Sequence, residues 1–219
     1  MYALKEKIHV FDLDGTLVDS MPIAVKIVLD FLTENGVSYS DEIIKILIPL
    51  GFKGIAKYYV SHFDIKMTAE EVFACFLEKL KDAYAYEIPL KAHVLETLQV
   101  LKKQGIRLNV LTASPHIFTD PCLQNRGIYK FFDNVWSSEE FGFLKSQKEI
   151  YGAVANALGV GIEDIVLIDD SLEVIKAAAS ARISTVGVYD DAWKKGWNEI
   201  QKTAKYTIAD FSDLLKIVE

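Results

Sequence analysis

The feature that most constrains the fold is an alternation of short apolar runs and amphipathic segments from Lys91 onward. Buried strands are predicted where apolar residues cluster, at 107–111, 134–137, 165–168 and 185–188. Helical periodicity fills the intervals, at 94–104, 116–125, 146–158 and 172–181. Strands that alternate with helices form parallel sheets covered on both faces. The sequence therefore predicts an α/β fold with a doubly wound, Rossmann-like parallel sheet.

A segment of different character interrupts this alternation after the first strand. It is nearly all helical, with helices expected from Met21 to Asn35, over 41–50, through Tyr59 after a turn at Gly51–Gly54, and after the capping box Thr68–Glu71. Pro89 marks a plausible return to the main domain. The predicted organisation is an α/β core domain of residues 1–18 and 89–219 with a four-helix cap domain over 19–88.

Charge and composition narrow the classes of partner. The chain has 219 residues and a net charge of −7, with no basic run, which argues against nucleic acid and anionic membranes. It shows no membrane-spanning stretch and no apolar signal segment near its start. The two cysteines, Cys75 and Cys122, suit a reducing compartment. These features predict a cytoplasmic protein and indicate no particular oligomeric state.

The first predicted strand, Ile8–Phe11, ends in two carboxylates, Asp12 and Asp14, followed by Gly15. Strand periodicity points both acids the same way, and two like charges there are costly without positive charge nearby. One interpretation is an ordinary polar turn capped by Asp. The more economical one is a bound cation and an anionic substrate, with one carboxylate as nucleophile and the other as acid and base.

Polar groups also follow later strands. Thr112 and Ser114 come after one apolar run, Asp169 and Asp170 after another, and Lys145 precedes a helix. The carboxyl ends of parallel strands meet at one edge of a sheet, so these groups are expected to converge on Asp12. Oxygen donors without a nearby His or Cys cluster favour Mg²⁺.

These stretches resemble the motifs of the haloacid dehalogenase superfamily. The run from Phe11 to Ser20, Phe-Asp-Leu-Asp-Gly-Thr-Leu-Val-Asp-Ser, resembles the first motif in its phosphatase form. Thr112 resembles the second motif, and Asp169-Asp170 the acidic fourth motif. Lys145 resembles the third, although Lys145-Ser146-Gln147-Lys148 lacks both prolines of the usual Lys-Pro-x-Pro, and Lys148 is a rival lysine. A helical cap between the first and second motifs is also a family arrangement.

The resemblance implies roles for the acids. Asp12 is the expected nucleophile and a metal ligand. Asp14 is the expected acid and base, and its backbone carbonyl is the part expected to bind the metal. Asp170 matches the metal-binding acid, and Asp169 a neighbour that ligates directly or through water. Ser171 is expected to cap a helix.

The resemblance also implies roles for uncharged and basic groups. Thr112 and Lys145 are expected to stabilise the transferring phosphoryl group, and Thr16, Ala113 and Ser114 to contact substrate. Substrate choice is assigned to the cap, with Lys53 in its predicted turn as the candidate contact; a solvated surface lysine is the alternative. His116 is a further candidate contact because it lies close to the second motif.

The expected activity is Mg²⁺-dependent hydrolysis of small phosphorylated metabolites through an aspartyl-phosphate. Superfamily members that act on halides or phosphonates generally lack an acid at the position of Asp14, so the resemblance implies phosphate esters as substrates. The first motif, with Asp19-Ser20 and Pro22, looks most like phosphoglycolate phosphatases. One alternative is a sugar-phosphate mutase resembling β-phosphoglucomutase, in which Gly-Val typically stands where this chain has Gly15-Thr16. Another is a non-catalytic phosphate-sensing or partner-binding protein.

Overall fold

The computed structural model describes residues 4, 7–40, 42–47 and 50–218. The chain divides into two compact units. The core unit comprises Met1–Asp19 and Pro89–Glu219, and the cap unit comprises Ser20–Ile88. The first boundary therefore falls one residue later than the sequence pattern suggests.

The core unit is built on a six-stranded sheet in the order β3-β2-β1-β4-β5-β6, with every pairing parallel. The strands are β1 (Ile8–Phe11), β2 (Leu108–Thr112), β3 (Asn134–Ser137), β4 (Ile165–Asp169), β5 (Ser184–Val188) and β6 (Tyr206–Ile208). The predicted doubly wound α/β fold is confirmed, and β6 is an addition that the sequence pattern did not indicate. The two strands that end in acids, β1 and β4, are neighbours at the centre of the sheet.

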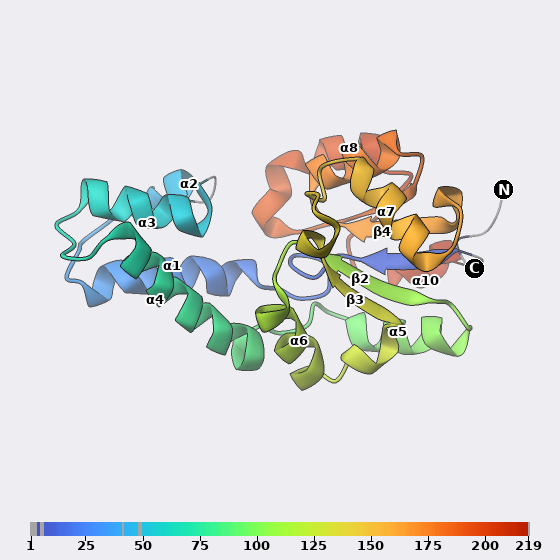
Figure 1. The fold of residues 1–219 in the computed structure, drawn as a ribbon, viewed down its shortest axis with the longest axis horizontal. Coiled ribbons are helices and arrows are strands. Elements are labelled where there is room, and N and C mark those ends of the chain that lie inside the picture. Colours follow the sequence, from blue (N-terminus) through green and yellow to red (C-terminus); the bar gives the residue numbers. More distant parts are fainter. Residues whose placement is uncertain (1–3, 5–6, 41, 48–49, 219) are drawn as a thin grey trace. The chain divides into compact units, whose positions relative to one another are not determined.

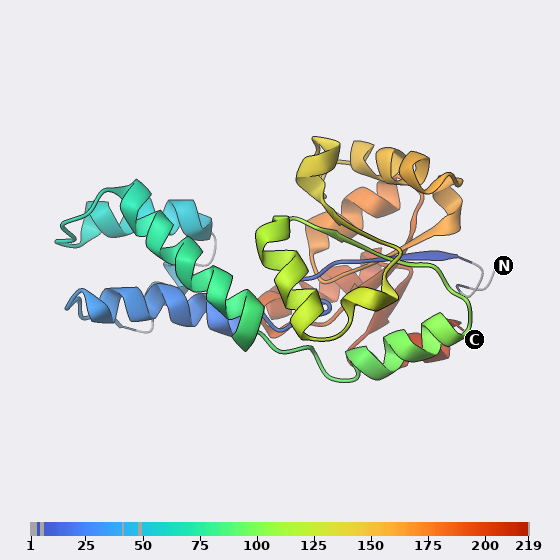
Figure 2. The same cartoon turned by 60° about the horizontal axis from the view of Figure 1, so that its bottom comes forward.

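Helices cover both faces of this sheet (Figures 1 and 2). One face carries α7 (Glu149–Leu158) and α8 (Leu172–Ser180), with α9 (Trp197–Thr203) packed beside α8. The other carries α5 (Val94–Lys103), α6 (His116–Asn125) and α10 (Asp213–Val218). Short 3₁₀ turns complete the unit: η4 (Tyr129–Phe131), η5 (Ser138–Phe141), η6 (Ile162–Asp164) and η7 (Asp191–Gly196). Burying each large aliphatic side chain of such a core stabilises the fold by about 1.5–3 kcal/mol.

The cap unit is helical. Its elements are α1 (Met21–Glu34), α2 (Ile43–Leu47), α3 (Gly51–His62), α4 (Ala69–Asp82) and the π-helical turn η3 (Ala83–Glu87). Three buried aromatic rings form its centre: the centroid of Phe31 lies 5.3 Å from that of Phe76 and 6.1 Å from that of Tyr59. The Tyr59 hydroxyl donates to the Val28 carbonyl at 2.9 Å, which satisfies this polar group inside the apolar centre.

Helix α3 corrects one sequence prediction. The expected turn at Gly51–Gly54 is wrong, because the helix begins at Gly51 and includes Lys53. Gly51 has a φ of +61°, which glycine tolerates. Helical glycine costs only about 1 kcal/mol relative to alanine, so burial of Ile55, Ala56 and Tyr59 outweighs it. The predicted helix over 41–50 is observed as α2; residues 41, 48 and 49 lie outside the described ones.

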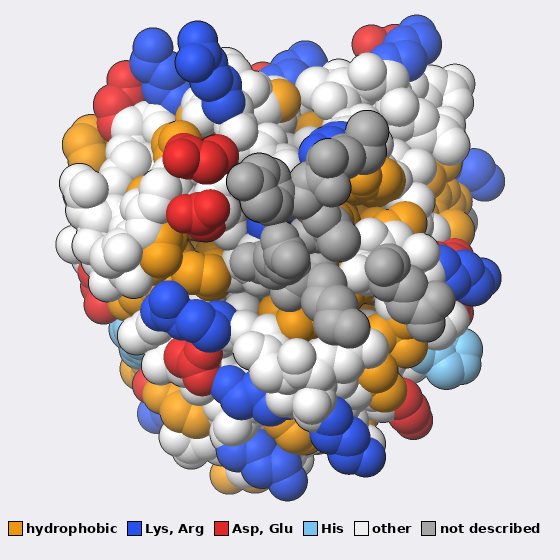
Figure 3. All heavy atoms as spheres, turned by 90° about the vertical axis from the view of Figure 1, so that its right-hand side faces the viewer, with side chains coloured by type: hydrophobic (Ala, Val, Ile, Leu, Met, Phe, Trp, Pro, Cys, Tyr) orange, Lys and Arg blue, Asp and Glu red, His pale blue; other side chains and the backbone are white. Residues whose placement is uncertain are grey.

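The surface carries charges of both signs. Basic, acidic and hydrophobic side chains are interspersed over the face that Figure 3 shows. Within the described ranges, no helix is both long and apolar enough to traverse a bilayer. Both cysteines are free thiols; Cys122 is buried and Cys75 is half-buried.

Candidate active site

The loop after β1 is a tight, internally bonded turn. The Leu13 carbonyl accepts hydrogen bonds from the amides of Thr16, Leu17 and Val18, at 3.3, 2.9 and 3.0 Å. Gly15 has a φ of +78°, and a Cβ there would collide with the Asp170 carboxylate. Only glycine fits this position, so the loop brings its backbone directly against the end of β4.

Three carboxylates meet beside this loop. Asp12, Asp169 and Asp170 are buried, and one oxygen from each lies within 4.8 Å of the others. The Lys145 ammonium contacts Asp12 Oδ1 at 2.5 Å and Asp169 Oδ2 at 2.7 Å. Asp169 Oδ2 has no partner besides this ammonium among the described residues. One lysine cannot balance three buried acids, so the cluster is suited to a further cation.

Burial controls the ionisation of these groups. It raises the pKa of Asp12 to about 7; Lys145 opposes this increase, while Asp169 and Asp14 add to it. Burial, followed by repulsion from Asp169 and Asp12, also raises the pKa of Asp170 well above its usual value. For Lys145, burial favours the neutral amine, but the adjacent acids raise its pKa far above the ordinary range. A cation at the cluster would favour the ionised carboxylates.

The Asp14 side chain lies outside the three-carboxylate cluster. The Ser114 hydroxyl donates to Asp14 Oδ2 at 2.6 Å, and the Ser114 amide donates to Thr112 Oγ1 at 3.0 Å. Ser114 therefore connects the ends of β1 and β2. Thr112 Oγ1 accepts the hydrogen bond from the Ser114 amide, so the proton of the Thr112 hydroxyl can be donated to another group. The predicted contact with a phosphoryl oxygen requires such a donor.

The other two predicted substrate contacts differ in accessibility. Thr16 is fully buried, and its hydroxyl donates to Asp170 Oδ1 at 3.0 Å. This bond favours a role in orienting Asp170 over direct contact with substrate. Ala113 is exposed, as the predicted contact with substrate requires.

The segment before α7 decides between the two candidate lysines. Lys145 is 6% exposed and reaches the acids, whereas Lys148 is exposed to solvent. The helix begins at Glu149 and not at Ser146, because 144–147 form a turn in which the Gln147 amide bonds the Leu144 carbonyl at 2.9 Å. The Tyr151 hydroxyl donates to the Lys145 carbonyl at 2.6 Å. These bonds hold the segment in place of the missing prolines.

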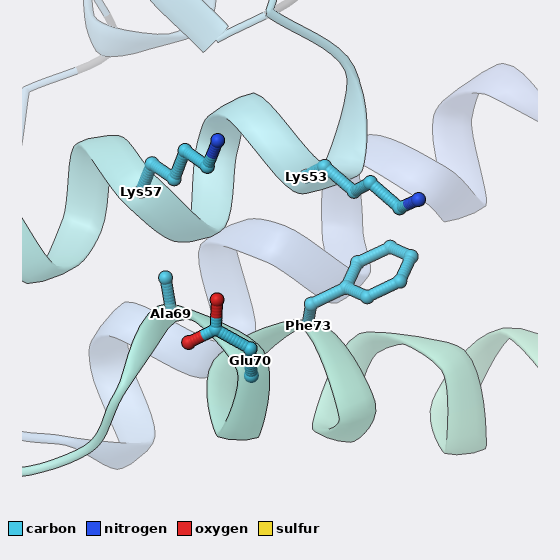
Figure 4. Close-up of a pocket in the computed structure, with 5 residues that line it drawn as sticks. All are labelled: Lys53, Lys57, Ala69, Glu70 and Phe73. Atoms are coloured by element: carbon cyan, nitrogen blue, oxygen red, sulfur yellow. The ribbon is translucent and has the colours of Figure 1, made fainter.

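Lys53 lies in the cap unit, where α3 faces α4 (Figure 4). With Lys57 it lines a pocket of about 290 Å³, opposite Ala69, Glu70 and Phe73. Its ammonium lies 5.5 Å from the centroid of the Phe73 ring, a cation–π contact.

His116 and Ser171, on the core unit, also have defined surroundings. Both nitrogens of His116 are engaged at 2.9 Å, one by Asp120 and one by Glu140. Ser171 occupies the N-cap position of α8 as predicted, but its side chain makes no capping bond; its amide instead donates to Asp169 Oδ1 at 2.8 Å.

Two residues that border the site were not identified from the sequence. Tyr151 supports Lys145 through its hydroxyl, and no local pattern distinguishes it from an ordinary core aromatic residue. Lys91 donates to the Gly15 carbonyl at 2.7 Å. No local pattern distinguishes it from a surface lysine, because its partners are distant in the sequence.

Comparison with known proteins gives a consistent family assignment. The model of the "Haloacid dehalogenase-like hydrolase" family matches residues 9–188. A phosphoglycolate phosphatase from Colwellia psychrerythraea is 31% identical over 195 residues, which cover 84% of this chain and 85% of the relative. A glyceraldehyde 3-phosphate phosphatase from Methanocaldococcus jannaschii is 28% identical over 224 residues, with 95% of each chain covered.

Solved structures show the same fold. A "putative beta-phosphoglucomutase" from Thermotoga maritima superposes with a TM-score of 0.83. The match covers 97% of this chain and 100% of the other, at 22% identity.

Proposed function

Because the chain belongs to the haloacid dehalogenase-like hydrolase family, we propose that it is a Mg²⁺-dependent phosphatase of small phosphorylated metabolites. The observation that carries this proposal is the Lys145 ammonium held between Asp12 and Asp169, beside Asp170. A buried carboxylate in contact with a fixed ammonium is suited to attack a phosphoryl group whose negative charge needs compensation.

In the first step, Asp12 attacks phosphorus and forms an aspartyl-phosphate, while the bond to the leaving alcohol breaks. Asp14 gives its proton to the departing oxygen. Lys145 and the Thr112 hydroxyl stabilise the negative charge on the phosphoryl oxygens. The Ser114 bond, at 2.6 Å, holds the Asp14 side chain away from the other acids.

In the second step, water hydrolyses the aspartyl-phosphate. Asp14, left ionised by the first step, removes a proton from that water, and the acyl–phosphate bond breaks to release inorganic phosphate and Asp12. Lys145 remains beside Asp12 in both steps. Each of the two acids therefore returns to its starting protonation state.

The residues at the cluster fit Mg²⁺, since they supply three buried carboxylates that a single ammonium, that of Lys145, cannot neutralise. Asp12, Asp170 and Asp169 would hold the ion, with the Asp14 backbone carbonyl as the ligand that the family resemblance adds. When bound, Mg²⁺ would neutralise charge on the carboxylates and the phosphate.

We further propose a phosphoglycolate-like or similarly small substrate. The Colwellia relative, a phosphoglycolate phosphatase, supports a phosphoglycolate-like substrate. The Methanocaldococcus relative, a glyceraldehyde 3-phosphate phosphatase, supports other small phosphorylated metabolites. Lys53 of the cap is proposed to contribute to substrate choice. The mutase alternative predicts net isomerisation of β-glucose 1-phosphate with little free phosphate.

The test is hydrolysis of an aryl phosphate, followed by a panel of phosphorylated metabolites ranked by kcat/KM. We expect phosphate release that requires Mg²⁺, stops with a chelator and is abolished by Asp12→Asn. Asp213→Asn is the control, because Asp213 pairs with Lys216 on α10. Turnover that is indifferent to both chelation and Asp12→Asn would overturn the mechanism.

A further inference from the structure

The chain returns to the core unit alongside residues 12–18, the loop after β1 that carries Asp12 and Asp14. We call this segment the catalytic loop. Leu90 forms an antiparallel bridge with Val18, and the Asp19 amide donates to the Pro89 carbonyl at 3.0 Å. The Lys91 amide donates to the Leu17 carbonyl, also at 3.0 Å. These bonds place Lys91 beside the loop that carries Asp12 and Asp14.

The Lys91 side chain is turned toward this loop. Its ammonium donates to the Gly15 carbonyl at 2.7 Å, the Tyr189 carbonyl at 2.8 Å and Asp190 Oδ2 at 2.9 Å. Three acceptors match the three N–H groups of an ammonium. The side chains of Lys91 and Asp190 are 20% and 5% exposed, so the ion pair is largely shielded from water.

Asp190 is itself held in place. Its second oxygen, Oδ1, accepts the Ala192 amide at 2.9 Å, at the start of η7. The ammonium is thus anchored on one side by the segment after β5, and it reaches the Gly15 carbonyl on the other. This anchoring makes Lys91 a defined brace and not a mobile surface charge.

Gly15 is the point at which the catalytic loop most needs a brace. It joins Asp14, the proposed acid and base, to Thr16, which orients Asp170. Glycine has the softest backbone of any residue, and the peptide between Gly15 and Thr16 is restrained on its N–H side by the 3.3 Å bond from the Thr16 amide to the Leu13 carbonyl. Rotation of this peptide would carry both neighbours with it. The bond from Lys91 fixes the direction of that peptide's carbonyl.

We propose that Lys91 is a positioning residue for the catalytic loop, acting on Asp14 and Thr16 through the Gly15 carbonyl. It does not touch the reacting atoms. The catalytic part of this inference rests on the proposed phosphatase function, whereas the bracing of the loop does not.

The test compares Lys91→Met, which keeps an unbranched apolar side chain but removes the ammonium, with Lys103→Met. Lys103 is an exposed lysine at the end of α5, so its replacement removes the same charge without a brace. For Lys91→Met we expect kcat on an aryl phosphate to fall roughly 10–10²-fold, since a small misplacement in an active site can cost 10²-fold. KM should change less than about threefold, because phosphate contacts are retained.

A second readout does not depend on turnover. The amides of 15–18 are bonded within the loop, so their hydrogen exchange reports its opening. In the absence of substrate we expect exchange over 12–18 to be about tenfold faster in Lys91→Met, corresponding to a factor of ten in the opening equilibrium. Lys103→Met should match the wild type.

The two readouts separate the possible failures. Unchanged exchange over 12–18 overturns the proposal. Faster exchange with unchanged kcat overturns the catalytic part and leaves a structural brace. Wild-type protein that hydrolyses no phosphate ester contradicts the proposed function, while the exchange measurement still tests Lys91. If Lys91→Met does not fold, Lys91→Gln replaces it, with the same expected direction because its shorter amide cannot satisfy all three oxygens.

Discussion

Lys145 of the core unit and Lys53 of the cap unit show how differently the two units use charge. Lys145 is buried and bridges two acids, whereas Lys53 is exposed and lies over an aromatic ring. Burying an ion costs several kcal/mol unless its partners are well placed, so the geometry around Lys145 is tightly specified. An exposed lysine keeps its hydration and carries no desolvation cost. The rest of the chain therefore does not have to supply precisely placed partners for it. We therefore expect chemistry to depend on the core and selectivity to depend on the cap.

The sharpest test of the core is Asp14→Asn. General acid–base catalysis contributes about 10²–10⁴-fold, and kcat should fall by that factor. An aryl leaving group needs little protonation, so the hydrolysis of the aspartyl-phosphate should slow most. We expect a burst of about one equivalent of aryl alcohol in rapid-quench kinetics, because formation and breakdown of the intermediate separate. Asp133→Asn, at the surface pair with Lys102, is the control; a linear time course for Asp14→Asn at the wild-type rate would contradict the assignment.

Lys145→Met tests whether Lys145 or Lys148 is the lysine that acts with the buried acids in catalysis. Removing a single stabilising donor costs about 10²–10³ in kcat, and we expect at least this loss because Lys145 also carries charge. Lys148→Met, three residues away and exposed, should remain within about twofold, since surface charges contribute little. The measurement is kcat on an aryl phosphate, corrected for the folded fraction. A larger loss in Lys148→Met would reverse the assignment.

Lys53→Ala probes the cap. For the metabolite with the highest kcat/KM we expect a decrease of about tenfold, the magnitude of one charged hydrogen bond. The aryl phosphate, which lacks the metabolite's polar groups, should be hydrolysed as before. Lys45→Ala, at the exposed pair with Glu42, is the matched control. Equal kcat/KM for wild type and Lys53→Ala across the panel would identify Lys53 as a solvated surface lysine.

Tyr59→Phe tests the cap as a packed unit. Loss of the bond to the Val28 carbonyl should lower the free energy of unfolding by about 0.5–1.5 kcal/mol, because one buried hydrogen bond is removed from the centre of the cap unit. Tyr86→Phe removes a hydroxyl from a cap tyrosine that is 73% exposed and should have no measurable effect. Urea denaturation measures both, and equal stabilities would show that the hydroxyl contributes nothing.

The smallest expected effect is a pH dependence at His116. Hydrogen bonds that the imidazole donates to Asp120 and then to Glu140 raise the pKa of His116 above its usual value. The stabilisation is fully present below the unfolded pKa, about 6.5, and is lost as pH rises through the raised folded pKa. Because the ring is partly exposed, we expect less than about 1 kcal/mol. The stability difference between wild type and His116→Gln should shrink from pH 6 to pH 9, and growth of that difference would contradict the assignment.

Helices and strands were predicted correctly where the local spacing of apolar residues matches the side chains that are buried in the structure. The strand at Ile8–Phe11, the helix at His116–Asn125 and the strand at Asn134–Ser137 have the predicted bounds. Helix α3 departs from prediction because the packing of Ile55 and Tyr59 overrides the local preference of two glycines for a turn. β6 was missed because it has only three residues, and its pairing with β5 is what makes it a strand.

By itself, the sequence determined the reaction class, because the run from Phe11 to Ser20 resembles the first motif of the superfamily in its phosphatase form. Acids directly after apolar runs, and a glycine after the first pair, are local features that persist however the chain packs. Only the tertiary structure decided which groups meet: Lys145 and not Lys148 reaches the acids, and Thr16 turns to Asp170. Lys91 reaches carbonyls 76 and 98 residues away. Such contacts depend on how the strands are ordered in the sheet, and no local pattern of residues specifies that order.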